Sequence, residues 1–310
     1  MTVIKKVLII LSFAILITNL VNAEELSMNV NSPNLEFYSQ KNIVFNITLS
    51  EKVDILSYIN FDNFIPKETI LCKNCREYGF SKKVTKSFKE GYNDFLITAR
   101  TNHSETSFPV YFILDSKKPM ITSTLPKAKS FFSGDFEVNF REDNTQEIKL
   151  IYGNKEKGYK NETLDIQDCP FQGSLEIKCR KEVNLEEFNG KKIDYHFTIK
   201  DKGNLEKTSK SAEVSIDTDK PIIKSFNYTL SGKGVEFFIG LEEKNPSSVY
   251  FLDFFQSNRE PRKVMLCSKM KNSSCKINKR LDKGTHPIIL IAEDKAGNVD
   301  EKMSVIFVNA

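Results

Sequence analysis

The chain has 310 residues, of which 40% are hydrophobic and 28% are charged, and its formal net charge is +4. These proportions are those of a soluble globular protein with two or three domains, and they exclude a chain that is disordered throughout. Acidic and basic residues are interspersed rather than gathered into a basic patch, so we expect no nucleic-acid partner.

Residues 1–23 have the features of a secretory signal peptide. Lys5 and Lys6 precede an apolar run from Val7 to Val21, and Val21 and Ala23 stand where a signal peptidase reads the chain. The run has 15 residues, fewer than the roughly 20 needed to cross a bilayer. The alternative is an uncleaved N-terminal segment that anchors the chain in a membrane. In both cases we expect the rest of the chain to be extracellular or at the cell surface.

The residues after this segment alternate between apolar and polar side chains, which is the period of a β-strand with one buried face. The first such strand contains Ile43, Phe45, Ile47 and Leu49. An apolar run over 53–59 follows it, then Gly91 with a strand over 92–99, and finally an alternating strand from Phe108 to Leu114.

The same order of signals returns twice along the chain, which indicates an internal repeat. The counterparts in the second repeat are the strand with Phe136, Val138 and Phe140, the run 148–152, Gly190 and the strand 192–200. Those in the third are the strand with Val235, Phe237, Ile239 and Leu241, the run 248–255, Gly284 and the strand 285–293.

Two similar stretches join the repeats: "LDSKKPMI" over 114–121 and "IDTDKPII" over 216–223. In each, a proline follows an alternating strand, where its fixed φ and missing N–H suit a strand exit or a linker. We therefore predict a signal peptide over 1–23 and domains over 24–117, 118–219 and 220–310. About seven short strands per domain, separated by frequent turns, predict an all-β fold of three tandem antiparallel β-sandwiches.

Six cysteines fall two to a repeat: Cys72 and Cys75, Cys169 and Cys179, Cys267 and Cys275. Each pair occupies the same slot, between the apolar run and the later glycine. In an exported chain this favours three local disulfides, each closing one hairpin. Two alternatives were weighed. "CKNC" at 72–75 has the C-x-x-C spacing of thiol oxidoreductases but lacks their βαβ context, and a zinc site would need two further ligands nearby.

The spacing of nucleophiles, histidines and carboxylates indicates no catalytic site. His103, His196 and His286 lie in different repeats and form no metal-binding cluster. His196 alternates with apolar neighbours and is expected to face solvent, and we expect no acid or nucleophile beside His103 or His286. We therefore predict no enzyme, no cofactor and no resident metal.

Calcium is one further ligand to weigh for an exported chain. Asp217 and Asp219 have D-x-D spacing at the second junction, where a bound cation can stiffen a linker. The first junction has Lys117 in place of the second aspartate, which would repel a cation. We therefore favour solvated linker charge over a calcium site.

Five N-x-[ST] sequons permit glycosylation at Asn46, Asn102, Asn161, Asn227 and Asn272. The motif is short enough to arise about this often by chance. The sequence therefore permits glycans at these positions without indicating them.

The stretch "IAEDKAGNVDE" over 291–301 ends an alternating strand with Asp, Ala-Gly-Asn and a second strand. It resembles the last hairpin of the Ig-like repeat domains of bacterial and archaeal surface proteins. Weaker copies stand at 201–207 and 100–106. We expect Gly297 and Asn298 to supply the φ > 0 conformations of a hairpin turn. The resemblance implies Ig-like sandwiches and no catalytic residues.

Repeats, export signal and paired cysteines together predict a secreted or cell-surface protein with a structural, adhesion or protein-interaction role. Its partner would be a protein or a glycan at the cell surface, bound at loops or a sheet edge. Two alternatives remain. An exposed row of Tyr or Phe on one sheet would favour a carbohydrate- or ligand-binding module, and a polar pocket would favour an unrecognised enzyme or inhibitor.

Overall fold

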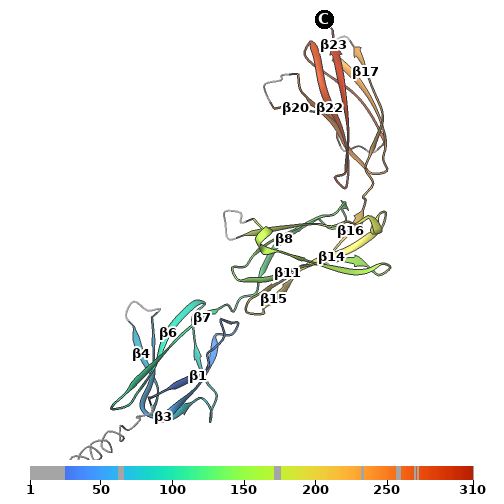
Figure 1. Ribbon diagram of the computed structural model, residues 1–310. Coiled ribbons are helices and arrows are strands. Elements are labelled where there is room, and N and C mark those ends of the chain that lie inside the picture. The colour runs from blue at the N-terminus through green and yellow to red at the C-terminus, as the bar shows by residue number, and fades with distance from the viewer. Residues whose placement is uncertain are drawn as a thin grey trace, which may run out of the picture. The chain divides into compact units, whose positions relative to one another are not determined.

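The computed structural model describes residues 25–61, 66–170, 176–231, 234–255, 260–268, 270 and 272–309, so the predicted signal peptide lies outside the described residues. The chain divides into two compact units, one ending at Lys117 and the other beginning at Lys118 (Figure 1). The described residues are strands with two short 3-10 helices, η1 (Ile166–Asp168) and η2 (Glu186–Phe188). No helix within these ranges is long and apolar enough to cross a membrane.

The first unit is one sandwich of seven strands. They are β1 (Met28–Ser32), β2 (Phe37–Tyr38), β3 (Asn42–Asn60), β4 (Lys67–Tyr78), β5 (Val84–Ser87), β6 (Gly91–Arg100) and β7 (Glu105–Leu114). Their order is β1-β3-β6-β7-β2, with β4 and β5 also paired to β3. Alternate side chains point inward and form a core with stacked aromatic rings, among them Phe45, Phe88 and Phe95.

Strand β3 corrects the expectation of two separate strands over 43–49 and 53–59. The chain runs extended for 19 residues and pairs in turn with β1, β5, β4 and β6. Ser50, Glu51 and Lys52 lie between the two predicted strands, and they include no Gly, Pro or Asn to turn the chain. The second and third repeats do carry Asn at this point, and there the two strands are separate.

The second sandwich begins the other unit and has nine strands. They are β8 (Met120–Leu125), β9 (Phe131–Phe132), β10 (Asp135–Arg141), β11 (Thr145–Asn154), β12 (Gly158–Leu164), β13 (Ile177–Glu182), β14 (Lys192–Asp201), β15 (Glu206–Thr208) and β16 (Ala212–Ile216). One sheet has the order β13-β10-β8 and the other β12-β11-β14-β16-β9, with β15 paired to β14. Between them lies a separate core that includes the fully buried Phe136, Phe197 and Tyr195.

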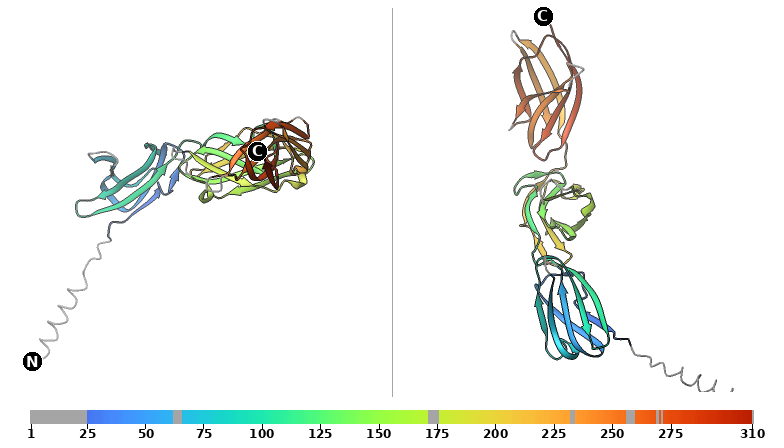
Figure 2. Two further views of the ribbon diagram at one scale, coloured as in Figure 1. Left: turned by 90° about the horizontal axis from the view of Figure 1, so that it is seen from above. Right: turned by 90° about the vertical axis from the view of Figure 1, so that its left-hand side faces the viewer.

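The third sandwich has seven strands in two layers (Figure 2). They are β17 (Ile222–Ser231), β18 (Gly234–Glu242), β19 (Pro246–Asp253), β20 (Arg262–Ser268), β21 (Ser274–Lys279), β22 (Gly284–Asp294) and β23 (Val299–Val308). The sheets are β17-β18-β21 and β20-β19-β22-β23. A third core, with Phe237 and Phe251 at its centre, lies between them. The all-β fold of tandem Ig-like sandwiches is thus confirmed, while the exact domain boundaries stay a prediction.

The six cysteines form the three predicted local disulfides, but the disulfides do not close hairpins. Cys72 and Cys75 both lie in β4, and Cys169, which follows η1, joins Cys179 in β13. The third joins Cys267 in β20 to Cys275 in β21, strands of opposite sheets. Cys267 and Cys275 lie on strands of opposite sheets, so their disulfide ties the two layers of the third sandwich together. In the second sandwich, Cys169 stands in the chain between β12 of one sheet and β13 of the other.

We expect removal of Cys267–Cys275 to destabilise the third sandwich by about 2–3 kcal/mol, because a cross-link between layers restricts the unfolded chain and Cys275 is buried in the core. The double substitution Cys267→Ala, Cys275→Ala should lower the midpoint temperature of one unfolding transition in calorimetry. Cys72→Ala, Cys75→Ala is the matched control, since that disulfide spans three residues of one half-exposed strand. Equal losses in the two variants would contradict the layer-tying role.

Candidate functional site

His286 lies in a buried ion-pair setting that the sequence analysis did not anticipate. Its side chain is 1% exposed, and its Nδ1 lies 3.0 Å from an Asp253 carboxylate oxygen. Its Nε2 lies 2.9 Å from the Asp282 carbonyl oxygen, and Phe255 stacks on the ring. The expectation that no acid lies near His286 was therefore wrong. Both ring nitrogens are engaged and covered, so neither can reach a substrate, and the pair holds β19 against β22.

The junction between the second and third sandwiches brings three carboxylates together. Asp217 follows β16, Glu243 follows β18 and Asp294 ends β22, and carboxylate oxygens of all three lie within 4.8 Å of one another. Asp219, which has D-x-D spacing with Asp217 but was not favoured as a calcium ligand, is exposed. Oxygen atoms so grouped are the kind of ligand that a hard cation such as calcium takes, and these three residues could hold one.

Burial and mutual repulsion act on the same three groups. Burial raises the pKa of Asp294, and the nearby Asp217 carboxylate adds to that rise, while hydrogen bonds from Asn298 and Ala296 oppose it. Burial likewise raises the pKa of Glu243, helped by Asp217 and Asp294. Glu243 and Asp294 therefore favour protonation more than isolated carboxylates would.

The Ala-Gly-Asn turn that follows Asp294 contacts the linker that precedes the third sandwich. The Asn298 side-chain amide donates to the backbone carbonyls of Asp217 and Asp219 at 2.8 and 3.1 Å, and to Asp294 Oδ2 at 2.8 Å. Gly297 has φ +88°, as predicted, but Asn298 does not have a positive φ. The asparagine is needed for its amide group, which three acceptors share, rather than for a left-handed conformation.

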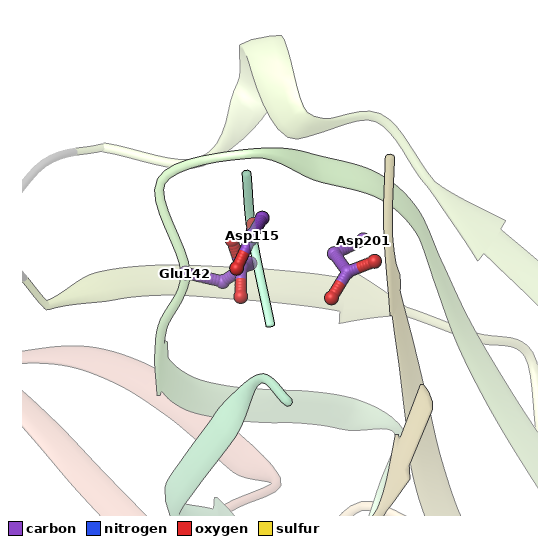
Figure 3. Close-up of side chains that lie close together, drawn as sticks. All are labelled: Asp115, Glu142 and Asp201. Carbon is purple, nitrogen blue, oxygen red and sulfur yellow. The ribbon is translucent and has the colours of Figure 1, made fainter. Parts of the chain in front are cut away.

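The second sandwich repeats this local arrangement with Glu142 and Asp201, shown in Figure 3. The Glu142 carboxylate accepts a hydrogen bond from the backbone N–H of Asn144 at 2.8 Å. The Glu243 carboxylate likewise accepts one from the backbone N–H of Asn245 at 2.6 Å. Asp201 ends β14 as Asp294 ends β22. In the sequence, Asp115 of "LDSKKP" occupies the position of Asp217 in "IDTDKP".

An open cleft lies beside the junction between the second and third sandwiches, and most of the residues that line it are charged. Lys191, Lys192 and Lys220 face it together with Asp219, while Phe131 is one of its few apolar residues. Small-molecule sites are mostly apolar with a few directed polar groups. The cleft combines charged groups of both signs with apolar residues such as Phe131 and Ile222, and this mixture indicates no particular ligand.

Two outward sheet faces expose large apolar side chains. In the first sandwich, Tyr92 of β6 is 62% exposed and Tyr111 of β7 is 66% exposed. In the third, β23 exposes Met303, Val305 and Phe307. These surfaces were not located from the sequence, because alternation does not show which outward positions stay uncovered.

The sequons lie mostly on the surface. Asn102, Asn161, Asn227 and Asn272 are exposed, whereas Asn46 is half-buried and its side-chain oxygen accepts from Asn31. His103 is exposed, and His196 is half-buried on the face of β14 opposite the core.

Comparison with known proteins adds the fold alone. No family model and no curated protein match the chain. Among solved structures, the FN1–FN3 domains of chicken CNTN1 share 9% identity at a TM-score of 0.44, over 92% of this chain and 98% of that one. An I-band fragment of titin shares 14% identity at 0.39, over 92% and 99%. A Bacteroides ovatus glucan-utilisation protein, SGBP-B, in complex with a mixed-linkage heptasaccharide, shares 13% at 0.23, over 92% and 71%. Likenesses this distant assign no residue a role.

We expect Glu243→Gln to stabilise the second unit at pH 7 by about 1 kcal/mol, or roughly 2–4 °C in melting temperature, because it removes one of three repelling carboxylates. Glu243 and Asp294 bind protons more tightly in the folded state, so their contribution to stability is full below the unfolded pKa and is lost as pH rises through the folded pKa. The gain should therefore shrink in mild acid. Thermal melts with a chelator present measure it, and Glu242→Gln is the control, since Glu242 lies outside the cluster.

We expect Asn298→Ala to expose the linker, because it removes the amide that contacts Asp217 and Asp219. Limited proteolysis should then cut near 217–222 at least several-fold faster than in the unchanged chain. Cutting near 115–120 serves as an internal reference. An unchanged ratio of the two cuts would show that the turn does not protect the linker.

Proposed function

We propose that the chain is an exported protein of three Ig-like domains, bounded at 24–117, 118–219 and 220–310, with an adhesive or protein-interaction role and no catalysis. The signal-like residues 1–23 and three disulfides support export to an oxidising compartment. The engaged nitrogens of His286 support a non-catalytic role.

The observation that carries this proposal is the outward face of β6 and β7 in the first sandwich. Tyr92 and Tyr111 stand on that face with Leu96 and Pro109, which pair directly across the two strands. A patch of this kind left in water is typical of an interaction site, and tyrosine supplies contact area at low entropic cost. We propose that this face binds a protein at the cell surface.

The polar end of the same face would set the limits of that contact. Arg100 bridges Glu68 and Glu105 at 2.7 and 2.8 Å, and Thr98 lies 3.0 Å from Ser107. These side chains form ion pairs and a hydrogen bond with one another across β4, β6 and β7. The apolar end and this polar network together have the pattern of an interface core beside its rim.

A glycan is the second candidate for the tyrosine end. Asp94 pairs with Tyr111 and stands two residues from Tyr92 on the same side of β6. Two exposed aromatic rings can stack on a sugar, and a carboxylate between them can accept hydrogen bonds from its hydroxyl groups. The row of exposed tyrosines is the feature expected of a carbohydrate-binding module.

We expect Tyr92→Ser, Tyr111→Ser to abolish most binding of the mature chain to the surface of its source cells, measured by flow cytometry with labelled protein. The control is Tyr159→Ser, an exposed tyrosine on β12 of the second sandwich. Protease treatment of the cells should remove the binding if the partner is a protein, and deglycosylation should remove it if the partner is a glycan. Undiminished binding by the double variant would refute this face as the site.

A further inference from the structure

The outward face of the four-stranded sheet in the third sandwich carries apolar side chains on each of its strands, exposed on β23 and β20 and half-buried or buried at Leu252, Ile289 and Ile291 between them. Strand pairing places Met265, Tyr250, Ile291 and Glu301 in one row, and Lys263, Leu252, Ile289 and Met303 in the next. Pro287 and Val305 follow, and then Thr285 and Phe307. Met303 is 81% exposed and Phe307 is 55% exposed. Side chains of this size on one continuous face form a surface that water solvates poorly.

The fold itself does not require this apolar face, as the second sandwich shows. Strand β14 occupies there the place that β22 occupies here. Its outward residues are Lys192, Asp194, His196, Thr198 and Lys200, all polar. The corresponding residues of β22 are Thr285, Pro287, Ile289, Ile291 and Glu293, apolar in the middle and polar at both ends. The two strands differ at the middle positions, so a sandwich of this kind does not need apolar residues there.

The edge of the sheet is less available than its face. The Tyr228 hydroxyl, from the opposite layer, accepts the Phe307 amide hydrogen at 3.1 Å. That contact occupies part of the row of backbone groups through which β23 would add another strand. None of the five sequons lies on the face, since Asn227 is on β17 and Asn272 precedes β21. The face is therefore the open surface for a partner.

The charges at the two sides of the face complement one another under a two-fold rotation. Lys263 stands on β20 at one side, with its Nζ 3.8 Å from the centre of the Tyr250 ring. Glu301 stands on β23 at the other side. When two copies pack face to face about an axis along the strands, β20 of each lies opposite β23 of the other. Each Lys263 then faces the strand that carries Glu301 in the other copy. The two residues are in neighbouring rows, and the usual angle between packed sheets can bring their side chains together.

The size of the face matches a modest interface between two copies. Four strands at their usual spacing, over about eight residues each, span roughly 19 Å by 27 Å. This is about 500 Å² for a flat surface, without the extra area of projecting side chains. Stable interfaces bury about 800 Å² per partner. Projecting side chains add to the area of the face, which stays at the small end for a stable interface, so we expect a reversible dimer.

We propose that the chain forms a two-fold dimer through the outward face of β20, β19, β22 and β23, with Leu252 and Ile289 on the two central strands, Met303 and Phe307 on β23 at the side, and Lys263 facing Glu301 of the second copy. This inference does not rest on the proposed cell-surface function. A dimer through the third sandwich leaves the β6–β7 face of each first sandwich to its own partner.

Sedimentation velocity of the purified mature chain, from about 1 to 200 µM, tests the proposal. We expect a reversible monomer–dimer equilibrium, with Met303→Glu and Phe307→Glu each raising the dissociation constant at least ~10-fold. Lys302→Glu is the control, because Lys302 is the exposed neighbour of Met303 on the other side of β23. Thermal melts of each variant confirm that the third sandwich is folded.

Charge exchange separates this dimer from other associations. Lys263→Glu and Glu301→Lys should each weaken the dimer, and the double exchange should restore most of its strength, because each pair is formed between copies. A monomer at every concentration would overturn the proposal and leave the face to a different partner. Association that ignores Met303→Glu, that grows beyond two copies, or that the double exchange fails to restore would overturn it too.

Discussion

Burial of every second side chain between two sheet layers is the constraint on which the rest of this structure depends. Most inward positions of β10, β14, β18 and β22 carry Phe, Ile, Val, Leu or Tyr, because packing between the layers selects them. A chain built this way has only its outward positions, its turns and its junctions left for recognition. The candidate surfaces therefore lie on the outward faces, at Tyr92 and Tyr111 in the first sandwich and at Met303 and Phe307 in the third.

The alternation that predicts the strands also hides the most polar contact in the third core. Asp253 and His286 occupy inward positions, two residues beyond Phe251 and two before Ile288. Their alternation with buried apolar neighbours places both residues on the inward face of the sheet. A buried acid and a buried histidine there must hydrogen-bond to each other or to another group, because an unsatisfied buried polar group is rare. The sequence does not display this pair directly, because Asp253 and His286 lie 33 residues apart and meet only through the pairing of β19 with β22.

The fold class, the repeat and the cysteine pairs follow from local patterns, which one sequence displays. The carboxylate cluster does not, because Asp217, Glu243 and Asp294 come from three segments that only the tertiary fold brings together. The same limit applies to Asp219: a D-x-D motif describes neighbours in sequence, whereas the carboxylates that meet Asp217 follow β18 and end β22. The disulfides show the intermediate case. Their pairing could be predicted from the slot in each repeat, whereas the crossing of Cys267–Cys275 between layers depends on how the sheets pack.

Comparison between repeats distinguishes the residues that the architecture requires from those left for recognition. The acid after the early strand, Glu142 or Glu243, and the aspartate that ends the long strand, Asp201 or Asp294, recur with the same backbone hydrogen bonds. Features that agree in this way serve what the repeats share, which is the shape of a turn beside a junction. The outward faces of β14 and β22 disagree at their middle positions, polar in one and apolar in the other. Because identical folds tolerate either face, the apolar one in the third sandwich carries information about a partner that the fold alone does not need.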